Sequence, residues 1–333
     1  MGFKGITSIL LAWPFVSFYW AKKKADRSWS EKCMKWELPG DVESVKALEI
    51  LPLIDWYADD ENLATEPGVS YLIKTEESTV LFDVGYNMKR EHPSPLLRNM
   101  SKLGISFDQI DTIIISHPHA DHVGGDINQL KRQFSPSKGH VDLSGKKIFL
   151  PPGMSHPDFN TMQVQRPVKI ARGIISTGPI YSSQFILGNT LFPMGITPEQ
   201  ALVVDIKGHG VVIIVGCGHQ GLERILKLVD HLFDKPVYGI VGGLHYPVTE
   251  SRMTAFGGRL EVQKYFGTGK LPWSPITKHE ALNHISMLKG YKPKVVSLSA
   301  HDSCDWSINA FREAFGPDYK DLKVGKSIRI PET

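Results

Sequence analysis

The string SHPHADHVGGD at residues 116–126 constrains this chain more than any other part of its sequence. It follows the apolar run DTIIIS, which predicts a buried strand. Four side chains that commonly bind metals lie close together in it: His117, His119, Asp121 and His122. Imidazole and carboxylate are ligands of zinc, and iron and manganese accept them too. In extended chain His117 and His119 point the same way and can share one ion, while Asp121 and His122 can face a second ion.

Three more histidines come directly after predicted strands. His219 follows VVIIVGCG, His245 follows GIVGGL and His301 follows VVSLSA. Functional side chains gather on loops at the edge of a rigid sheet, so we expect these three near the first four. The predicted metal ligands are His117, His119, Asp121, His122, His219 and His301. It stays open whether His219 or His245 completes the first site. Cys217 can add an extra or bridging ligand, although a lone cysteine in an apolar strand is more often part of the core.

Hydrophobic periodicity gives the order of the elements. Short β-branched runs predict strands at residues 48–54, 69–74, 79–84, 111–117, 146–152, 201–207, 210–216, 236–243 and 294–300. Apolar residues at helical spacing predict helices at residues 93–104, 221–233, 279–290 and 306–316. Strands come first and strand–helix alternation follows. This order predicts an α+β fold, a four-layer αββα sandwich of two face-to-face sheets with helices outside.

The HPHADH string with the glycines after it resembles the signature of the metallo-β-lactamase superfamily. Five segments resemble, more narrowly, the subfamily of dihydropterin-ribofuranosylaminobenzene phosphate synthases and related metal-dependent hydrolases. These segments are LFDVG at 81–85, SHPHADHVGG at 116–125, EQALVV at 199–204, GCGHQG at 216–221 and GGLH at 242–245. The resemblance covers residues 47–330. It implies the αββα fold and two divalent metal ions, with zinc as the first choice and manganese or iron as alternatives.

The resemblance also leads to a mechanistic hypothesis. A hydroxide bridging the two ions attacks phosphorus or a carbonyl carbon. Asp121 and His245 are the predicted catalytic residues, and His245 donates a proton to the leaving group or stabilises its charge. Asp83 either orients a ligand histidine or caps a turn. Asp302 is expected beside the ligands or the substrate.

The segment 246–276 is rich in glycine and aromatic residues. As an insertion beside the site, it can form a lid, with Arg252 and Arg259 reading an anionic or aromatic substrate. The alternative is a solvated loop with a small core of its own. We therefore expect a small-molecule substrate, with a phosphorylated one among the options.

Four classes of function compete. A hydrolase acting on a phosphodiester or ester-type small molecule leads. A transferase that joins a pterin to a ribosylaminobenzene phosphate ranks lower, because the chain departs from the subfamily pattern at Gly218 and Asp302. A di-iron redox or sensor protein comes third. A purely structural metal protein ranks last, because structural zinc sites are usually rich in cysteine.

The N-terminal residues 5–21 carry no charge and are followed by Lys22, Lys23 and Lys24. This pattern predicts a membrane anchor at residues 1–24, a linker at 25–46 and a catalytic domain at 47–333 that lies on the cytoplasmic side of the membrane. The alternative is an apolar helix that packs on the domain or a partner. The net charge of +3, with no basic stripe, speaks against a nucleic-acid partner. Three widely spaced cysteines form no disulfide framework and fit a reducing compartment.

Overall fold

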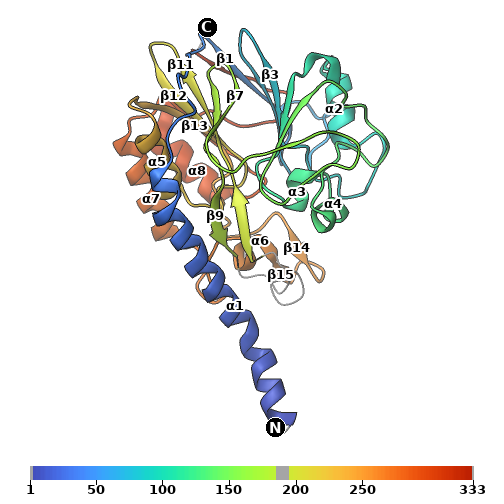
Figure 1. The fold of residues 1–333 in the computed structure, drawn as a ribbon, viewed down its shortest axis with the longest axis vertical. Coiled ribbons are helices and arrows are strands. Elements are labelled where there is room, and N and C mark those ends of the chain that lie inside the picture. Colours follow the sequence, from blue (N-terminus) through green and yellow to red (C-terminus); the bar gives the residue numbers. More distant parts are fainter. Residues whose placement is uncertain (1–2, 185–194, 332–333) are drawn as a thin grey trace.

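Two β-sheets pack face to face with helices on both outer sides (Figure 1). The computed structural model describes residues 3–184 and 195–331, and of their side chains residue 13 and those from 15 onward. The first sheet has the order β17 (Ile328–Ile330), β1 (Leu48–Ile54), β2 (Ser70–Lys74), β3 (Thr79–Phe82), β4 (Thr112–Ile114), β5 (Lys147–Leu150), β6 (Met162–Gln163). The second has the order β16 (Val295–Leu298), β13 (Val237–Gly242), β12 (Gly210–Val215), β11 (Leu202–Ile206), β8 (Ile174–Ser176), β7 (Val168–Ala171).

The helices divide between the two outer faces. On the side of the first sheet lie α2 (Pro95–Lys102), α3 (Ala120–Val123) and α4 (Asp126–Lys131). On the side of the second lie α5 (Leu222–Leu232), α7 (Lys278–Gly290) and α8 (Asp305–Phe315). The remaining elements are α1 (Phe3–Glu31), α6 (Val262–Phe266), the pairs β9 (Ile180–Ser183) with β10 (Ile196–Glu199) and β14 (Thr254–Ala255) with β15 (Leu260–Glu261), and 3₁₀ turns at Cys33–Lys35, Phe107–Gln109 and Gly316–Asp318.

Three apolar layers hold this sandwich together. The middle layer lies between the sheets and includes Tyr71, Val204 and Ile214, all fully buried. One outer layer, with Ile225 of α5, packs against the second sheet, and the other, with Met100 of α2, packs against the first. The predicted four-layer αββα sandwich is therefore confirmed.

Both sheets direct their functional residues to one edge. Strands β3, β4 and β5 run parallel in the first sheet, and β12, β13 and β16 run parallel in the second. Parallel neighbours end at the same side of a sheet. Asp83 and His117 therefore leave the first sheet, and Cys217, His245 and His301 leave the second, where the two edges face each other.

The predicted membrane anchor is wrong. Among the described residues, no helix combines the length and the apolar content that crossing a membrane requires. Helix α1 continues through the charged residues 22–24 to Glu31, and it lies against β9. Phe18, Ala21 and Ala25 on this helix are buried. The absence of charge in residues 5–21 does not reveal that part of the apolar surface of this helix packs on the protein. The predicted location beside a membrane is therefore not supported. The division into domains at residues 24 and 46 stays a prediction.

Asp55, at the end of β1, connects the two sheets. Its carboxylate accepts hydrogen bonds from the Tyr71 hydroxyl of β2 at 3.0 Å and from the Ser299 hydroxyl beyond β16 at 2.6 Å. The backbone N–H groups of Trp56 and Ala300 also donate to it. Complete burial raises the pKa of Asp55 to about 6, although these donors oppose the rise.

This pKa predicts a measurable pH dependence. The carboxyl of the unfolded chain has a pKa of 3.8. Between pH 4 and 6 the folded state therefore binds the proton more tightly than the unfolded state, and the free energy of unfolding falls as the pH rises. The loss amounts to about 3 kcal/mol. The variant Asp55→Asn has no ionisable group here and lacks this pH dependence. The difference in unfolding free energy between wild type and variant should therefore change by about 3 kcal/mol between pH 4 and 6. Denaturant titrations of chelator-treated protein at pH 4, 5, 6 and 7 measure it; a constant difference contradicts the prediction.

Candidate metal centre

Three histidine rings meet at one side of the centre. His117 Nε2 lies 3.0 Å from His119 Nδ1, which lies 3.1 Å from His219 Nε2. His117 and His119 come from the loop after β4, and His219 comes from the loop after β12. His219 thus lies in contact with His119, and the His245 ring lies beside His219 with the two ring centroids 4.6 Å apart.

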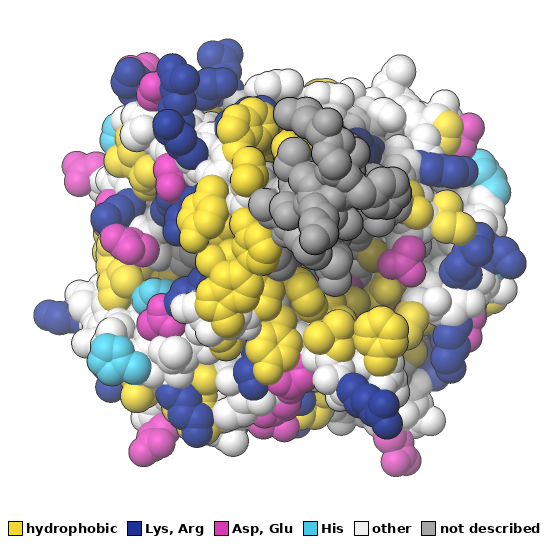
Figure 2. All heavy atoms as spheres, turned by 90° about the horizontal axis from the view of Figure 1, so that it is seen from below, with side chains coloured by type: hydrophobic (Ala, Val, Ile, Leu, Met, Phe, Trp, Pro, Cys, Tyr) yellow, Lys and Arg dark blue, Asp and Glu magenta, His cyan; other side chains and the backbone are white. Residues whose placement is uncertain are grey.

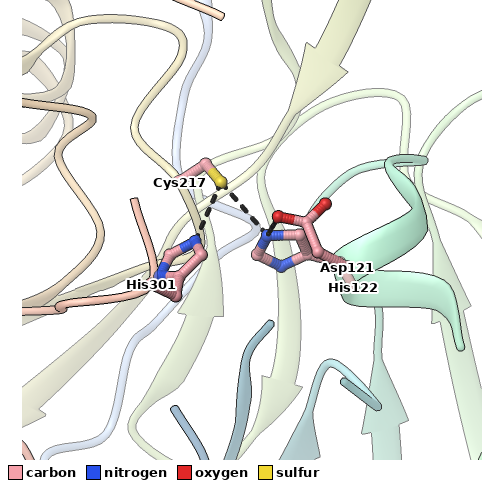
Figure 3. Close-up of side chains that lie close together, drawn as sticks. All are labelled: Asp121, His122, Cys217 and His301. Carbon is pink, nitrogen blue, oxygen red and sulfur yellow. Dashed lines mark hydrogen bonds and ion pairs between the residues drawn. The ribbon is translucent and has the colours of Figure 1, made fainter. Parts of the chain in front are cut away.

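A second group lies beside the first and contains Asp121, His122, Cys217 and His301 (Figure 3). Cys217 Sγ lies 3.1 Å from His122 Nε2 and 3.1 Å from His301 Nε2. Asp121 Oδ2 is 3.5 Å from His122 Nε2. These four residues are buried, and one ligand atom of each lies within 4.8 Å of the others.

Cys217 occupies the space between the groups. It recurs in the sets Asp121–His122–Cys217–His301, His117–Cys217–His219 and Cys217–His245–Asp302, each of which could hold a metal ion. Imidazole, carboxylate and thiolate together are the ligand types that zinc accepts. The residues present therefore fit a divalent metal centre in which the Cys217 sulfur is within reach of both groups.

Asp83 and Ser116 orient the rings on the side of the first sheet. Asp83 Oδ2 accepts hydrogen bonds from His122 Nδ1 at 2.7 Å and from the Ser116 hydroxyl at 2.6 Å. Ser116 Oγ then accepts from His117 Nδ1 at 2.9 Å. Because a carboxylate only accepts, both histidines carry a proton on Nδ1 and turn their Nε2 atoms to the centre. Asp83 thus makes the contact expected of an orienting residue.

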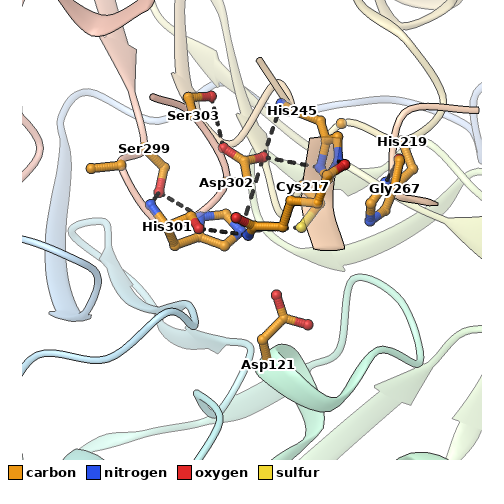
Figure 4. A network of polar contacts seen from close by, with 12 residues as sticks. Asp121, Cys217, His219, His245, Gly267, Ser299, His301, Asp302 and Ser303 are labelled. Atoms are coloured by element: carbon orange, nitrogen blue, oxygen red, sulfur yellow. Dashed lines mark hydrogen bonds and ion pairs between the residues drawn. The ribbon is translucent and has the colours of Figure 1, made fainter. Parts of the chain in front are cut away.

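Matching contacts fix the rings on the other side (Figure 4). Ser299 donates its proton to Asp55, so its oxygen accepts from His301 Nδ1 at 2.6 Å. The Gly267 carbonyl accepts from His219 Nδ1 at 2.9 Å. His301 and His219 therefore present unprotonated Nε2 atoms to the centre.

Electrostatics keep most of the rings neutral. Burial lowers the pKa of His119 to about 4, and burial with the neighbouring rings lowers the pKa values of His117, His219 and His301 far below the usual range. Burial also disfavours the charged form of His122, but the carboxylates of Asp121 and Asp83 overcome it and raise its pKa to about 10. Neutral rings are the form that binds metals, so an ion bound by His122 would displace the proton on its Nε2.

The Cys217 thiol is held neutral unless a cation is near. Burial, followed by the charges of surrounding carboxylates such as Asp121, raises its pKa well above the usual range. A divalent ion reverses this effect, because a coordinating thiol is deprotonated.

Sequence reasoning missed Glu199, which shapes the loop after β12. Its fully buried carboxylate accepts from the backbone N–H groups of Cys217, Gly218 and His219 at 2.9, 2.8 and 2.7 Å. Burial raises its pKa to about 7 despite these bonds. Glu199 lies in the EQALVV segment at the end of a predicted strand. The sequence of that segment does not show that its side chain binds the backbone of the loop at residues 217–219.

Glycine 124 makes the tight turn after the ligand string. Its φ is +81°, and a Cβ atom there would meet the Ser135 carbonyl oxygen at 1.9 Å. No other residue type fits this position without moving the backbone. Asp83 and His245 also have positive φ, 64° and 55°, a conformation that non-glycine residues adopt mainly where the surroundings enforce it.

His245 does not fit the predicted role of proton donor. The Gln263 carbonyl accepts a hydrogen bond from its Nε2 at 3.2 Å, so that nitrogen carries the proton. Its Nδ1 is buried and has no hydrogen-bond partner among the described residues. Burial lowers the pKa of the ring to about 4. The free Nδ1 is therefore an acceptor or a metal ligand. Asp302 accepts from the His245 backbone N–H and the Ser303 hydroxyl, and thus holds this loop.

The two lid arginines do not reach the centre. Arg252 donates to Asp305 at 2.5 Å and to the Ala300 carbonyl, and it stacks over Trp56 and Tyr57. Arg259 is exposed. Neither lines the cavity of about 360 Å³ beside the metal ligands. The cavity wall therefore gives no support to the prediction that these arginines bind an anionic substrate, and that role stays a prediction. Asp305 and the aromatic rings of Trp56 and Tyr57 contact Arg252 outside the cavity.

Comparison with known proteins agrees with this geometry. Residues 63–227 match the family model described as the metallo-β-lactamase superfamily, and this part of the chain belongs to that superfamily. The 7,8-dihydropterin-6-methyl-4-(β-D-ribofuranosyl)-aminobenzene-5′-phosphate synthase of Methanocaldococcus jannaschii is 23% identical over 325 residues, 87% of this chain and 98% of that protein. The transcription termination factor FttA of Cenarchaeum symbiosum is 27% identical over 207 residues, 58% of this chain and 30% of that protein.

A solved structure supports the fold. The crystal structure of Tm1679, described as a metal-dependent hydrolase of the β-lactamase superfamily, superposes with a TM-score of 0.56. It is 21% identical and covers 84% of this chain and 98% of its own. The chain thus has the metallo-β-lactamase fold, as its sequence motifs imply.

The Asp83 contacts predict an effect on metal affinity. Asp83→Asn removes the charge that fixes His122 and, through Ser116, His117, so we expect metal binding to weaken by about 10- to 100-fold. Asp205→Asn is the matched control, because Asp205 is equally buried but pairs with Lys235 away from the centre. Titration of zinc against a competing chelator measures both. Equal affinities in the two variants would show that Asp83 does not orient the ligands.

Proposed function

We propose that this protein is a metal-dependent hydrolase with a dinuclear centre. His117, His119 and His219 would hold one ion, and Asp121, His122 and His301 would hold the other, with Cys217 within reach of both groups. The observation that carries this proposal is the set of ring Nε2 atoms turned to one centre, each ring fixed by a partner on its Nδ1. The thiol favours zinc or iron over manganese.

When bound, two such ions lower the pKa of a water molecule between them and polarise the bond that it attacks. The protein's own residues supply orientation. Asp121 is the carboxylate on the open side of the centre, where it lines the cavity. His245 Nδ1 can accept a hydrogen bond from the attacking water, and its ring is held in place through Nε2 by Gln263.

A transferase remains the second candidate. It is favoured by the likeness to the Methanocaldococcus synthase, which extends over 98% of that protein. A transferase places a second substrate, not water, against the reacting atom. Product analysis separates the two, because a hydrolase releases the free acid and alcohol, and a transferase forms a joined product only when both substrates are present.

The hydrolase proposal predicts chelator-sensitive turnover. We expect about two zinc or iron ions per chain, and turnover of bis-p-nitrophenyl phosphate or p-nitrophenyl acetate that stops on chelation and returns with metal. His219→Ala should lose at least about 100-fold in kcat/KM. His284→Ala is the control, because His284 hydrogen-bonds Tyr246 outside the centre.

Elemental analysis and steady-state kinetics make these measurements. Turnover that survives complete metal removal contradicts the proposal. Reversible redox cycling of two irons, without hydrolysis, moves the assignment to a redox protein.

A further inference from the structure

The wall of the cavity beside the metal centre combines polar metal-binding residues with apolar residues of the lid. One side is formed by the centre itself, with His119, Asp121 and His219. The lid segment 246–276 contributes the apolar residues Met253, Leu260, Val262 and Phe266. The cavity volume of about 360 Å³ lies in the range of small-molecule sites. A substrate bound at the metals must therefore lie against an apolar surface.

No lysine or arginine lines this cavity among the described residues. The lid has four basic residues, and three of them pair with carboxylates outside the cavity wall: Arg252 with Asp305, Lys264 with Glu261 at 3.0 Å, and Lys270 with Glu280. The fourth, Arg259, is exposed and does not line the cavity. Apart from the metal ligands, the charged group in the wall is Asp126, whose carboxylate accepts from the Tyr86 hydroxyl at 3.2 Å. Such a wall offers a phosphate monoester no cationic partner beyond the metal ions.

The lid lies at the same end of the molecule as the first part of α1 (Figure 1). The Phe15 ring of α1 lies 5.3 Å from the Trp273 ring of the lid. Seen from this end, hydrophobic side chains gather across the face (Figure 2). Trp13 and Trp20 of α1, and Phe256 and Trp273 of the lid, are all at least half exposed. Apolar side chains are therefore also exposed on the outer surface of the lid and on the neighbouring helix α1.

Resting on the proposed hydrolase function, we propose that the substrate is an uncharged ester with an apolar acyl or aryl group, and that the lid residues Met253, Leu260, Val262 and Phe266 bind that group. In the reaction the water oxygen forms a bond to the carbonyl carbon, the ester C–O bond breaks, and a proton released by the water passes to the leaving alcohol, so that the products are the acid and the alcohol. The apolar group stays against the lid while the carbonyl faces the centre. This substrate class differs from the phosphorylated substrates of the synthase-like alternative.

The lid also connects substrate binding to the centre. The Gly267 carbonyl orients His219, and the Gln263 carbonyl orients His245. The Gln263 side chain donates to the His301 carbonyl at 2.7 Å. The residues next to Phe266 therefore hold ligand loops in place, so an apolar group that packs on Phe266 contacts the segment that positions the rings.

Chain-length dependence tests the proposal. The full chain, loaded with zinc, is assayed with p-nitrophenyl acetate, butyrate, octanoate and decanoate and with p-nitrophenyl phosphate. We expect kcat/KM to rise at least about tenfold from acetate to octanoate, since each buried methylene adds binding free energy. Phe266→Ala and Leu260→Ala should each lower the octanoate-to-acetate ratio about fivefold. Phe256→Ala is the matched control, because Phe256 lies in the same lid but is 80% exposed and does not line the cavity.

Binding without turnover separates this inference from the proposed function. Calorimetry of chelator-treated protein with octanamide, an uncharged probe, and with inorganic phosphate should show octanamide binding that Phe266→Ala weakens and Phe256→Ala does not. If octanamide binds in this way but no ester is hydrolysed, the hydrolase proposal fails and the apolar site stands. The apolar-substrate proposal is overturned if turnover is chelator-sensitive but kcat/KM does not change with acyl chain length. It is also overturned if the phosphate compound is preferred in both the turnover and the binding assay.

Discussion

Two buried carboxylates, Asp83 and Asp55, set the geometry on which the rest of the site depends. Asp83 fixes His122 directly and His117 through Ser116, and Asp55 fixes His301 through Ser299. In each of these hydrogen-bonded contacts the histidine carries a proton on Nδ1, and its Nε2 therefore faces the metal centre. A ring cannot turn away without leaving a buried polar group unpaired, which costs about 1–3 kcal/mol. The centre is therefore preorganised before an ion arrives.

The sandwich supplies these contacts from opposite sheets. Asp83 follows β3 of the first sheet, and Ser299 follows β16 of the second. Their meeting requires the parallel strands of both sheets to end at one edge, and the Tyr71–Asp55–Ser299 contacts join the sheets there. The lid adds a third source of orientation through its backbone carbonyls. Metal binding, sheet packing and lid position are therefore parts of one hydrogen-bonded arrangement.

Much of this could be predicted from sequence, because strand periodicity and a dense ligand string are local signals. The predicted helices at 93–104, 221–233, 279–290 and 306–316 overlap α2, α5, α7 and α8. What sequence could not show depends on distant contacts. The partners of Asp55, the loop held by Glu199 and the surface under α1 all lie far away in the chain. Likewise, the Arg252 side chain suggested an anion site until its Asp305 partner became visible.

The most direct test of this account is the anomalous scattering of crystals of the full chain, measured at the zinc and iron edges. The account predicts two strong peaks. One lies among the free nitrogens of His117, His119 and His219, and the other among Asp121, His122 and His301, with Cys217 Sγ near both. A single peak elsewhere, or rings at the centre that turn their protonated nitrogens inward, would contradict the central claim that buried carboxylates prepare a two-metal site.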